Sequence, residues 1–273
     1  MKRLDDTTNT TTSESESSEK DRNFVTALAR GLELLRAFGA KEEYLGNAEL
    51  SNRTGIPRPT VSRLTYTLTQ LGYLQHNQYL EKYRLGAGIL ALGYRYLANI
   101  GIRDIARPHL QQLADSTDCN VNLGAAEKTS MVYLETCHGS GPLIIRLDVG
   151  SRLPLATTAI GRAWLCGLPD ERRDKVLQEL KQLYGKDWPK LEKGIQKSRE
   201  DYARYGFCLS EGEWQTDISA VSMPLVLEDG AEIMAINCGG ASLRLSHERL
   251  VEKIGPRLKE VADNIRHELA PKR

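Results

Sequence analysis

Hydrophobic residues recur with the period of an α-helix in three segments near the start of the chain. The segment NFVTALARGLELLRAFG, residues 23–39, predicts a first helix whose apolar stripe faces a core: Val25, Leu28, Leu32 and Leu35. NAELSNRTG, residues 47–55, predicts a short second helix with Asn47 as its N-cap and Gly55 as its break. A third helix is predicted from about residue 58 to Gly72, with its own stripe: Val61, Leu64, Leu68 and Leu71.

Two prolines mark the start of the third segment, where the chain reads GIPRPTVSRLTYTLTQLGYLQ from residue 55 to residue 75. Proline is tolerated in the first turn of a helix, because its missing N–H would have no partner there. Two short helices joined by a glycine-containing turn predict a helix-turn-helix. The next stretch, GYLQHNQYLEKYRLG (72–86), predicts a short β-hairpin, or wing. We therefore expect a winged helix-turn-helix over residues 23–84.

Charge is distributed as a DNA-binding surface requires. The net charge of the 273-residue chain is only +1, so any basic patch must be local. Between Leu50 and Leu80 there are three arginines and no aspartate or glutamate, which favours contact with phosphates. Recognition helices present their N-terminal residues to base edges. An arginine side chain can donate hydrogen bonds to the N7 and O6 acceptors of guanine. The alternative is a solvated face that contacts nothing. The residues predicted to contact DNA are Arg53, Arg58, Thr60, Ser62, Arg63 and Tyr66.

The N-terminus and the cysteines indicate the cellular compartment in which the protein is expected to work. Residues 1–22 are rich in Ser, Thr and Glu and contain no apolar run, which predicts a disordered tail and not a signal peptide. No apolar run approaches the roughly 20 residues that cross a bilayer. The five cysteines are an odd number without CxxC spacing, which favours free thiols in a reducing cytoplasm.

Residues 85–101 predict a linker helix between two domains. Its apolar stripe could pack against the same helix of a second copy in a dimer: Leu85, Ile89, Leu92 and Tyr96. Gly86, Gly88 and Ala91 match the G-x-G-x-x-A spacing of dinucleotide-binding loops. That motif needs a buried strand before it, and EKYRL is short and mostly polar, so we reject the match.

Residues 102–270 predict a second domain of α+β class on a mostly antiparallel sheet. A helix is expected at 102–117 and a hairpin of strands at 120–127 and 130–137, with a third strand at 142–150. Two amphipathic helices follow, at 169–185 and 188–206. Two further strands are expected at 217–227 and 232–240, joined by a Glu-Asp-Gly turn. A closing helix begins at Ser246, its predicted cap, and Pro256 is expected to kink it.

Catalytic constellations are missing from this second domain. The sequence has no G-x-S-x-G, no H-E-x-x-H and no Walker loop. Cys137 and His138 are adjacent on a predicted strand, so their side chains point to opposite faces and fit a nucleophile–base pair poorly. The five histidines are scattered, which disfavours a metal site. We expect no enzyme activity, no metal and no cofactor.

Several of these segments resemble the IclR family of transcriptional regulators. PRPTVSRLTYTLTQLGYL (57–74) is similar to that family's recognition helix, ARGLELLRAF (29–38) to its first helix and YRLG (83–86) to its wing exit. Downstream, SRLPLATTAIGRAWLCGLP, YARYGFCLSEGEW and ISAVSMPLVLEDG resemble segments of its effector domain. The resemblance extends from residue 23 to about residue 268. Arg162 stands where lysine is common in the family. The resemblance implies a GAF-like or PAS-like effector domain and assembly as a dimer or a dimer of dimers.

A binding pocket is predicted where LPLATTAIG leads into a helix. Free N–H groups at a helix N-terminus attract anions, and Thr158 could contact the ligand there; alternatively, Thr157 or Thr158 is only an N-cap. The implied ligand is a small organic acid, aliphatic or aromatic. The family resemblance implicates seven effector-binding positions in this sequence: Leu153, Ala159, Ile160, Glu211, Ala220, Asn237 and Gly239.

Together, these features predict a sequence-specific regulator of transcription, repressor or activator, that binds a double-stranded DNA operator under control of the acid. In one alternative, the protein is a small-molecule enzyme with an appended DNA-binding module. In another, it is a dimeric DNA-binding protein that needs no ligand.

Overall fold

The computed structural model describes residues 23–39, 42–140, 147–227 and 232–270. Contacts divide the chain into two compact units, residues 1–95 and 96–273, which are treated separately below. The tail predicted for residues 1–22 lies outside the described residues. No helix within the described part of the chain is long and apolar enough to cross a membrane.

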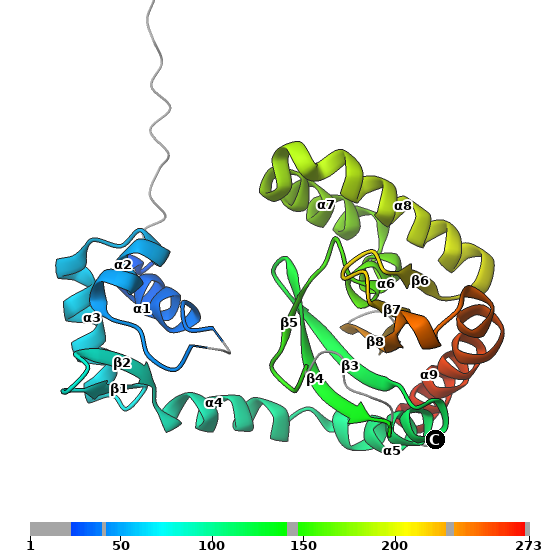
Figure 1. Cartoon of the computed structure of the whole chain (residues 1–273), viewed down its shortest axis with the longest axis horizontal. Helices are drawn as coiled ribbons and strands as arrows, with labels where there is room; N and C mark the ends of the chain where they lie inside the picture. The colour runs from blue at the N-terminus through cyan, green and yellow to red at the C-terminus, as the bar shows by residue number, and fades with distance from the viewer. Residues whose placement is uncertain (1–22, 40–41, 141–146, 228–231, 271–273) are drawn as a thin grey trace, which may run out of the picture. The chain divides into compact units, whose positions relative to one another are not determined.

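The N-terminal unit is built from three helices and a two-stranded hairpin (Figure 1). Its elements are α1 (Thr26–Arg36), α2 (Asn47–Thr54), α3 (Arg58–Gln70), β1 (Leu74–Asn77) and β2 (Lys82–Leu85). The predicted third helix and the predicted wing are therefore confirmed. The hairpin gains a further antiparallel pair, because Leu45 exchanges both backbone hydrogen bonds with Tyr83, at 2.9 and 2.8 Å. The N-cap of α2 is Gly46 and not Asn47; Glu49 Oε2 accepts the Gly46 N–H at 2.6 Å.

The stripe predicted for the first helix is wrong. Val25, Leu28 and Leu32 are 61%, 63% and 50% exposed, whereas Leu34 is fully buried against Leu50 and its neighbours. Leucines at positions 32, 34 and 35 allow two different apolar stripes on α1. In the structure, the stripe through Leu34 packs into the core of the N-terminal unit. Similarly, Leu71, which caps the end of α3, is 62% exposed, and the interior position between Val61 and Leu68 is taken by Thr65.

Two glycines bring the start of α4 (Ala87–Ala98) against the end of α3. A Cβ on Gly86 would lie 2.3 Å from the carbonyl oxygen of Gly72, and one on Gly88 would lie 2.9 Å from the same atom. Gly86 also donates its N–H to Tyr73 O at 2.8 Å. The G-x-G spacing is thus explained by close backbone packing. The apolar side chains of the predicted α4 stripe are half-buried or exposed, and none is buried.

Replacing Gly86 with alanine should loosen this junction. The clash is with backbone, which cannot rotate away, so we expect a loss of about 1–3 kcal/mol in local stability. Hydrogen exchange on the full chain should show faster exchange for residues 68–90. Gly93, within α4, is the matched control, because a Cβ there meets nothing within 4 Å. Equal protection in the two alanine variants would contradict this account of Gly86.

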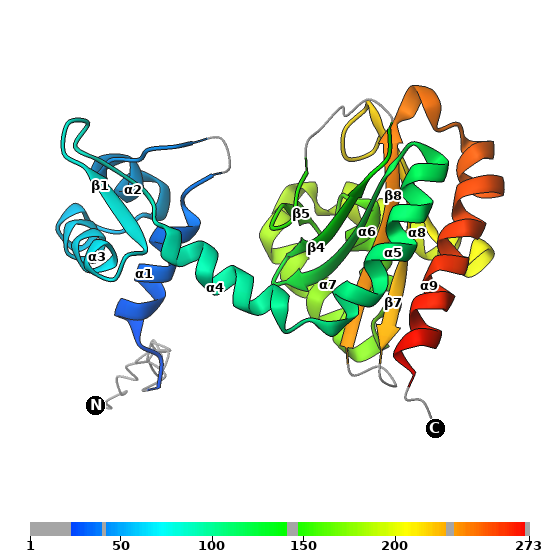
Figure 2. The same cartoon turned by 90° about the horizontal axis from the view of Figure 1, so that it is seen from below.

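The C-terminal unit is an α+β domain around one antiparallel sheet (Figure 2). The strand order is β5-β4-β3-β8-β7-β6. The strands are β3 (Asn120–Glu127), β4 (Ser130–His138), β5 (Arg152–Pro154), β6 (Cys208–Glu211), β7 (Ile218–Leu227) and β8 (Glu232–Ala241). Helices α5 (Gly101–Thr117) and α9 (Gly255–Leu269) lie side by side on one face. The other face carries α6 (Ala159–Gly167), which packs in turn on α8 (Trp188–Tyr205), next to α7 (Asp170–Tyr184).

Alternation along the strands separates two hydrophobic cores. Leu123, Ile236 and Cys238 face α5 and α9, whereas Tyr133 and Ala235 face α6. A cavity described below opens on the α6 side of the sheet.

Most of the elements predicted for this unit are present, with local differences. The strand predicted at 142–150 falls largely outside the described residues, and 147–150 form no strand; the turn at 228–230 also lies outside them. Strand β6 was not predicted. Ser246 Oγ accepts the N–H of Arg249 at 3.3 Å, which confirms the predicted cap. Before Pro256 the helix widens into a π-helical segment, Arg249–Ile254, which accommodates a residue without an N–H.

Candidate functional site

The outer face of α3 carries an acid-free group of polar side chains. Arg58, Ser62, Arg63 and Tyr66 are exposed, Tyr66 by 66%, and Thr60 is half-buried. The guanidinium groups of Arg58 and Arg63 have no ion-pair or hydrogen-bond partner among the described residues. We call these five residues the α3 face. Its two cationic groups are available to an external anion.

Arg53 is placed apart from the α3 face. Its Nη2 donates to Glu42 Oε1 at 2.6 Å, and its Nη1 donates to Ala37 O at 3.1 Å. The hydrogen bond from Arg53 holds the pKa of Glu42 below its ordinary value. Arg53 therefore ties α2 to the segment that follows α1. Glu42 lies outside the acid-free stretch 50–80, so the sequence pattern did not indicate that Arg53 pairs with an acid.

The tip of the hairpin presents an aromatic residue that sequence analysis missed. Asn77 Oδ1 accepts the N–H groups of Tyr79 and Leu80 at 3.0 and 3.1 Å, which closes the turn. Tyr79 is 95% exposed at this tip. The signal available in the sequence was the Asn at the first position of a hairpin turn.

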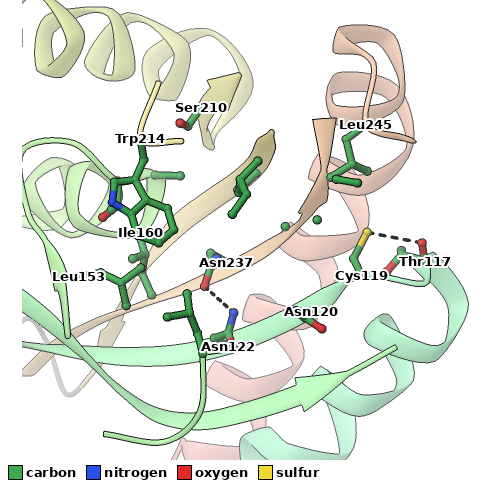
Figure 3. A pocket seen from close by; sticks show the side chains of 18 of the residues that line it. Thr117, Cys119, Asn120, Asn122, Leu153, Ile160, Ser210, Trp214, Asn237 and Leu245 are labelled. Atoms are coloured by element: carbon green, nitrogen blue, oxygen red, sulfur yellow. Dashed lines mark hydrogen bonds between the residues drawn. The ribbon is translucent and has the colours of Figure 1, made fainter. Parts of the chain in front are cut away.

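In the C-terminal unit, a cavity brings together most of the predicted ligand positions (Figure 3). Seven of the eight line it: Leu153, Thr158, Ala159, Ile160, Ala220, Asn237 and Gly239. They come from β5, the start of α6, β7 and β8. The structure adds further lining residues that the sequence did not indicate, among them Asn122, Tyr133, Ser210 and Trp214.

Glu211 does not line this cavity. Its Oε2 lies 3.2 Å from His247 Nδ1 at the surface, and the preceding residue of β6, Ser210, lines the cavity instead. Successive side chains of a strand point to opposite faces. The predicted ligand position on β6 is therefore one residue too far along the chain: Ser210 points into the cavity, and Glu211 points to the opposite face.

The start of α6 forms one wall of the cavity. Thr158 is its N-cap: the hydroxyl accepts the N–H of Gly161 at 3.3 Å and donates to Pro154 O at 2.8 Å. The N–H groups of Ala159 and Ile160 lie before Arg162, whose N–H makes the first intrahelical bond to Thr158 O at 3.0 Å, so they have no helical partner. A Cβ on Gly161 would lie 2.5 Å from Leu155 Cα, so this glycine lets α6 begin directly against the chain that leaves β5. The wall thus presents N–H donors beside apolar side chains.

The opposite end of the cavity is cationic, but its charges are engaged by the protein. Arg249 donates to Thr117 O at 3.0 Å and to Arg244 O at 2.9 Å. Arg244 in turn pairs with Asp118 at 3.1 Å. Cys119 lies at this end and donates to Thr117 O at 3.4 Å (Figure 3). The Cys238 thiol, then Thr117, then the charges of the two arginines lower the pKa of Cys119 to about 7 against the opposing effect of burial.

A buried ion pair supports the wall formed by α6. Arg162, which is 4% exposed, pairs with Glu213 and donates from Nε to Ala156 O at 2.9 Å. Lys197 Nζ lies 3.2 Å from the other oxygen of Glu213. The pair links α6 to the loop after β6, which carries Trp214 into the cavity.

Comparison with known proteins gives the family. A winged helix-turn-helix with a free basic face, followed by an α+β domain with an internal cavity, is the organisation of a DNA-binding transcriptional regulator with a ligand-binding domain. The model for the bacterial transcriptional regulator IclR C-terminal domain matches residues 94–267, and that for the IclR helix-turn-helix domain matches residues 27–78. The chain belongs to the IclR family of transcriptional regulators and is not an enzyme.

Relatives agree over nearly the whole chain. The HTH-type transcriptional regulator TsaQ1/TsaQ2 of Comamonas testosteroni is 33% identical over 253 residues, which cover 92% of this chain and 91% of that protein. The Pca regulon regulatory protein of Pseudomonas putida is 28% identical over 257 residues, covering 91% and 86%. The crystal structure of an IclR family transcriptional regulator from Brucella abortus superposes with a TM-score of 0.85 at 44% identity, covering 93% and 96%.

Proposed function

We propose that the α3 face reads the operator of this regulator. In a helix-turn-helix the second helix enters the major groove, and its N-terminal residues meet the base edges. Arg58 and Arg63 would donate to guanine, and the hydroxyl groups of Thr60, Ser62 and Tyr66 would position the helix on phosphates. The observation that supports this assignment is a pair of guanidinium groups, on an exposed and acid-free helix, that have no partner among the residues the structure describes.

We propose further that the protein acts as a homodimer or a dimer of dimers on a roughly palindromic site. Four apolar side chains, which we call the α1 face, are exposed at helical spacing: Phe24, Val25, Leu28 and Leu32. Burial of this surface against a second copy would remove it from water. It would also bring two α3 helices together on one DNA molecule, as two half-sites require.

The ligand that we propose for the C-terminal cavity is a small organic acid. Its carboxylate would accept the N–H groups of Ala159 and Ile160, where the helix dipole favours a negative charge. Leu153, Ile160 and Trp214 offer an apolar wall beside that point. The convergence of seven residues from four elements on one cavity carries this part of the proposal. Thr158 would then act as N-cap and cavity wall at once.

Control of DNA binding follows from differential affinity. The acid changes occupancy of the operator only as far as it binds one arrangement of the DNA-binding units better than another. In the proposed division of the chain, residues 23–84 bind DNA, residues 85–101 link, residues 102–270 bind the acid, and residues 1–22 form a tail. Five free thiols fit action in a reducing compartment, the cytoplasm.

Replacing Arg63 with alanine tests the DNA assignment. Fluorescence anisotropy with DNA from upstream of the protein's own gene should show a loss of about 1–3 kcal/mol, and random DNA should show a much smaller loss. The slope of affinity against salt should stay nearly unchanged, because a fall of about one would mark a lost phosphate contact. Arg30, exposed on α1, is the control for charge alone. Equal losses on both DNAs would mean that Arg63 contacts phosphate and does not read bases.

A further inference from the structure

Three polar side chains meet on the cavity side of the central strands. Asn122 of β3 and Asn237 of β8 are directly opposite each other in the antiparallel register, so their side chains share one face of the sheet. Tyr133 of β4 faces the same side and lines the same cavity. The three residues are 4%, 7% and 2% exposed, respectively, so bulk water does not solvate their polar groups.

One hydrogen bond and one close polar contact connect these three side chains into a chain. Asn122 Nδ2 donates to Asn237 Oδ1 at 3.2 Å (Figure 3). The Asn237 amide also lies next to the Tyr133 hydroxyl and lowers its pKa. Burial raises the pKa of Tyr133 far more than this contact lowers it, so the hydroxyl keeps its proton.

One hydrogen-bonding atom at the end of this chain is left over. Asn122 Oδ1 is buried and has no partner among the described residues. A buried carbonyl without a donor retains its desolvation cost, which a ligand with a suitable donor would remove. Because both amides can turn over together, the chain can also run from Tyr133 toward Asn122, and the group left over is then an N–H. A ligand hydroxyl satisfies either arrangement, since it both donates and accepts.

The surroundings restrict what carries this hydroxyl. In Figure 3 the two asparagines lie beside the apolar group formed by Leu153, Ile160 and Trp214. Ile160 also belongs to the first turn of α6, where the carboxylate is proposed to bind. A ligand that reaches both places needs an acidic group, a short apolar body and a hydroxyl.

We infer that Asn122, Asn237 and Tyr133 form a hydroxyl-recognition site and that the effector is a hydroxy-substituted carboxylic acid. This inference rests on the proposed function of the cavity and adds the chemical class of its ligand. Asn122 is the residue that distinguishes the hydroxy acid from its deoxy analogue. An aromatic or an aliphatic body is compatible with the apolar wall.

Matched pairs of acids test the inference on the full-length protein. Calorimetric titrations would use benzoate against its 3- and 4-hydroxy derivatives, and butanoate against its 3- and 4-hydroxy derivatives. We expect at least one hydroxy acid to bind about tenfold or more tightly than its deoxy partner. Binding of acids with equal affinity within every pair would overturn the inference while leaving the acid-binding cavity intact. Binding of none of them, with no thermal shift, would overturn the acid proposal itself and this inference with it.

Variants assign the selectivity to these residues. In Asn122→Leu the hydroxy and deoxy acids should bind equally, because the unsatisfied polar atom is gone. Asn122→Asp keeps an acceptor at the same place and should retain the preference. Asn264→Leu is the matched control, because Asn264 is exposed on α9 and does not line the cavity. Full selectivity in Asn122→Leu would exclude Asn122 as the determinant, and should that variant fail to fold, Tyr133→Phe must weaken the preference.

Discussion

Replacing Arg162 with alanine should lower the free energy of unfolding of the C-terminal unit by about 3–5 kcal/mol. Removing one member of a buried ion pair leaves the other poorly compensated, and here Glu213, whose side chain is 25% exposed, would keep only the more exposed Lys197. The variant also loses the hydrogen bond from Nε to Ala156 O. Urea denaturation followed by circular dichroism should show a lower midpoint.

Arg162→Lys separates charge from geometry. Lysine keeps the positive charge but lacks the planar fork that serves Glu213 and Ala156 O together. We expect a loss smaller than that of the alanine variant, and a midpoint for Arg162→Ala equal to that of the wild type would show that the pair contributes nothing to stability.

Acid should weaken the same contact. Burial acts to raise the pKa of Glu213, but Arg162 and Lys197 outweigh it and hold that pKa below the ordinary value of 4.5. A carboxyl whose pKa is lower in the folded state stabilises fully above its unfolded pKa, and the contribution is lost as pH falls through the folded pKa. Denaturation at pH 7 and below pH 4 should therefore show a smaller pH dependence for Arg162→Ala than for the wild type.

Leu28→Glu should weaken operator binding by about 10²- to 10⁴-fold. A carboxylate in the centre of the α1 face would have to be buried if two copies paired there, which is costly. A single DNA-binding unit then loses the effective concentration that its partner provides. The residue is 63% exposed, so folding should be unchanged. Sedimentation velocity and anisotropy on operator DNA, with circular dichroism as a check on folding, would measure the effect.

Leu183→Glu is the matched control for this variant. Leu183 is 60% exposed and lies on α7 in the C-terminal unit. We expect wild-type assembly and DNA affinity from it. If Leu28→Glu also retains both, copies of the chain do not associate through the α1 face, and dimers must form elsewhere.

The sequence predicted elements more reliably than the partners of single side chains. The α3 helix, the wing and the long strands β3, β4, β7 and β8 have strong periodicity between glycine or proline breaks, and periodicity is a local property. The stripe of α1 could not be predicted in the same way. Both Leu32 and Leu34 satisfy a helical repeat, and only packing against α2 and α3 decides which is buried.

Contacts between distant segments account for the remaining differences. Arg53 meets Glu42 across the turn between α1 and α2, and Arg162 meets Glu213 across 51 positions of sequence. No local pattern encodes either pairing. Seven of the eight predicted ligand positions do line one cavity, because family motifs preserve three-dimensional neighbours. Asn122 escaped notice because an asparagine within a strand gives no signal until its cross-strand partner is known.

The contact of Gly86 and Gly88 with Gly72 has a practical consequence for building chimeric regulators. The backbone after the wing is hydrogen-bonded to Tyr73 and pressed against the last turn of the recognition helix. A fusion junction placed at residue 84 would discard that support together with both glycines. A portable N-terminal cassette should therefore include Gly86 and Gly88, and a foreign sensor module should be spliced on beyond them, before the second unit begins at residue 96.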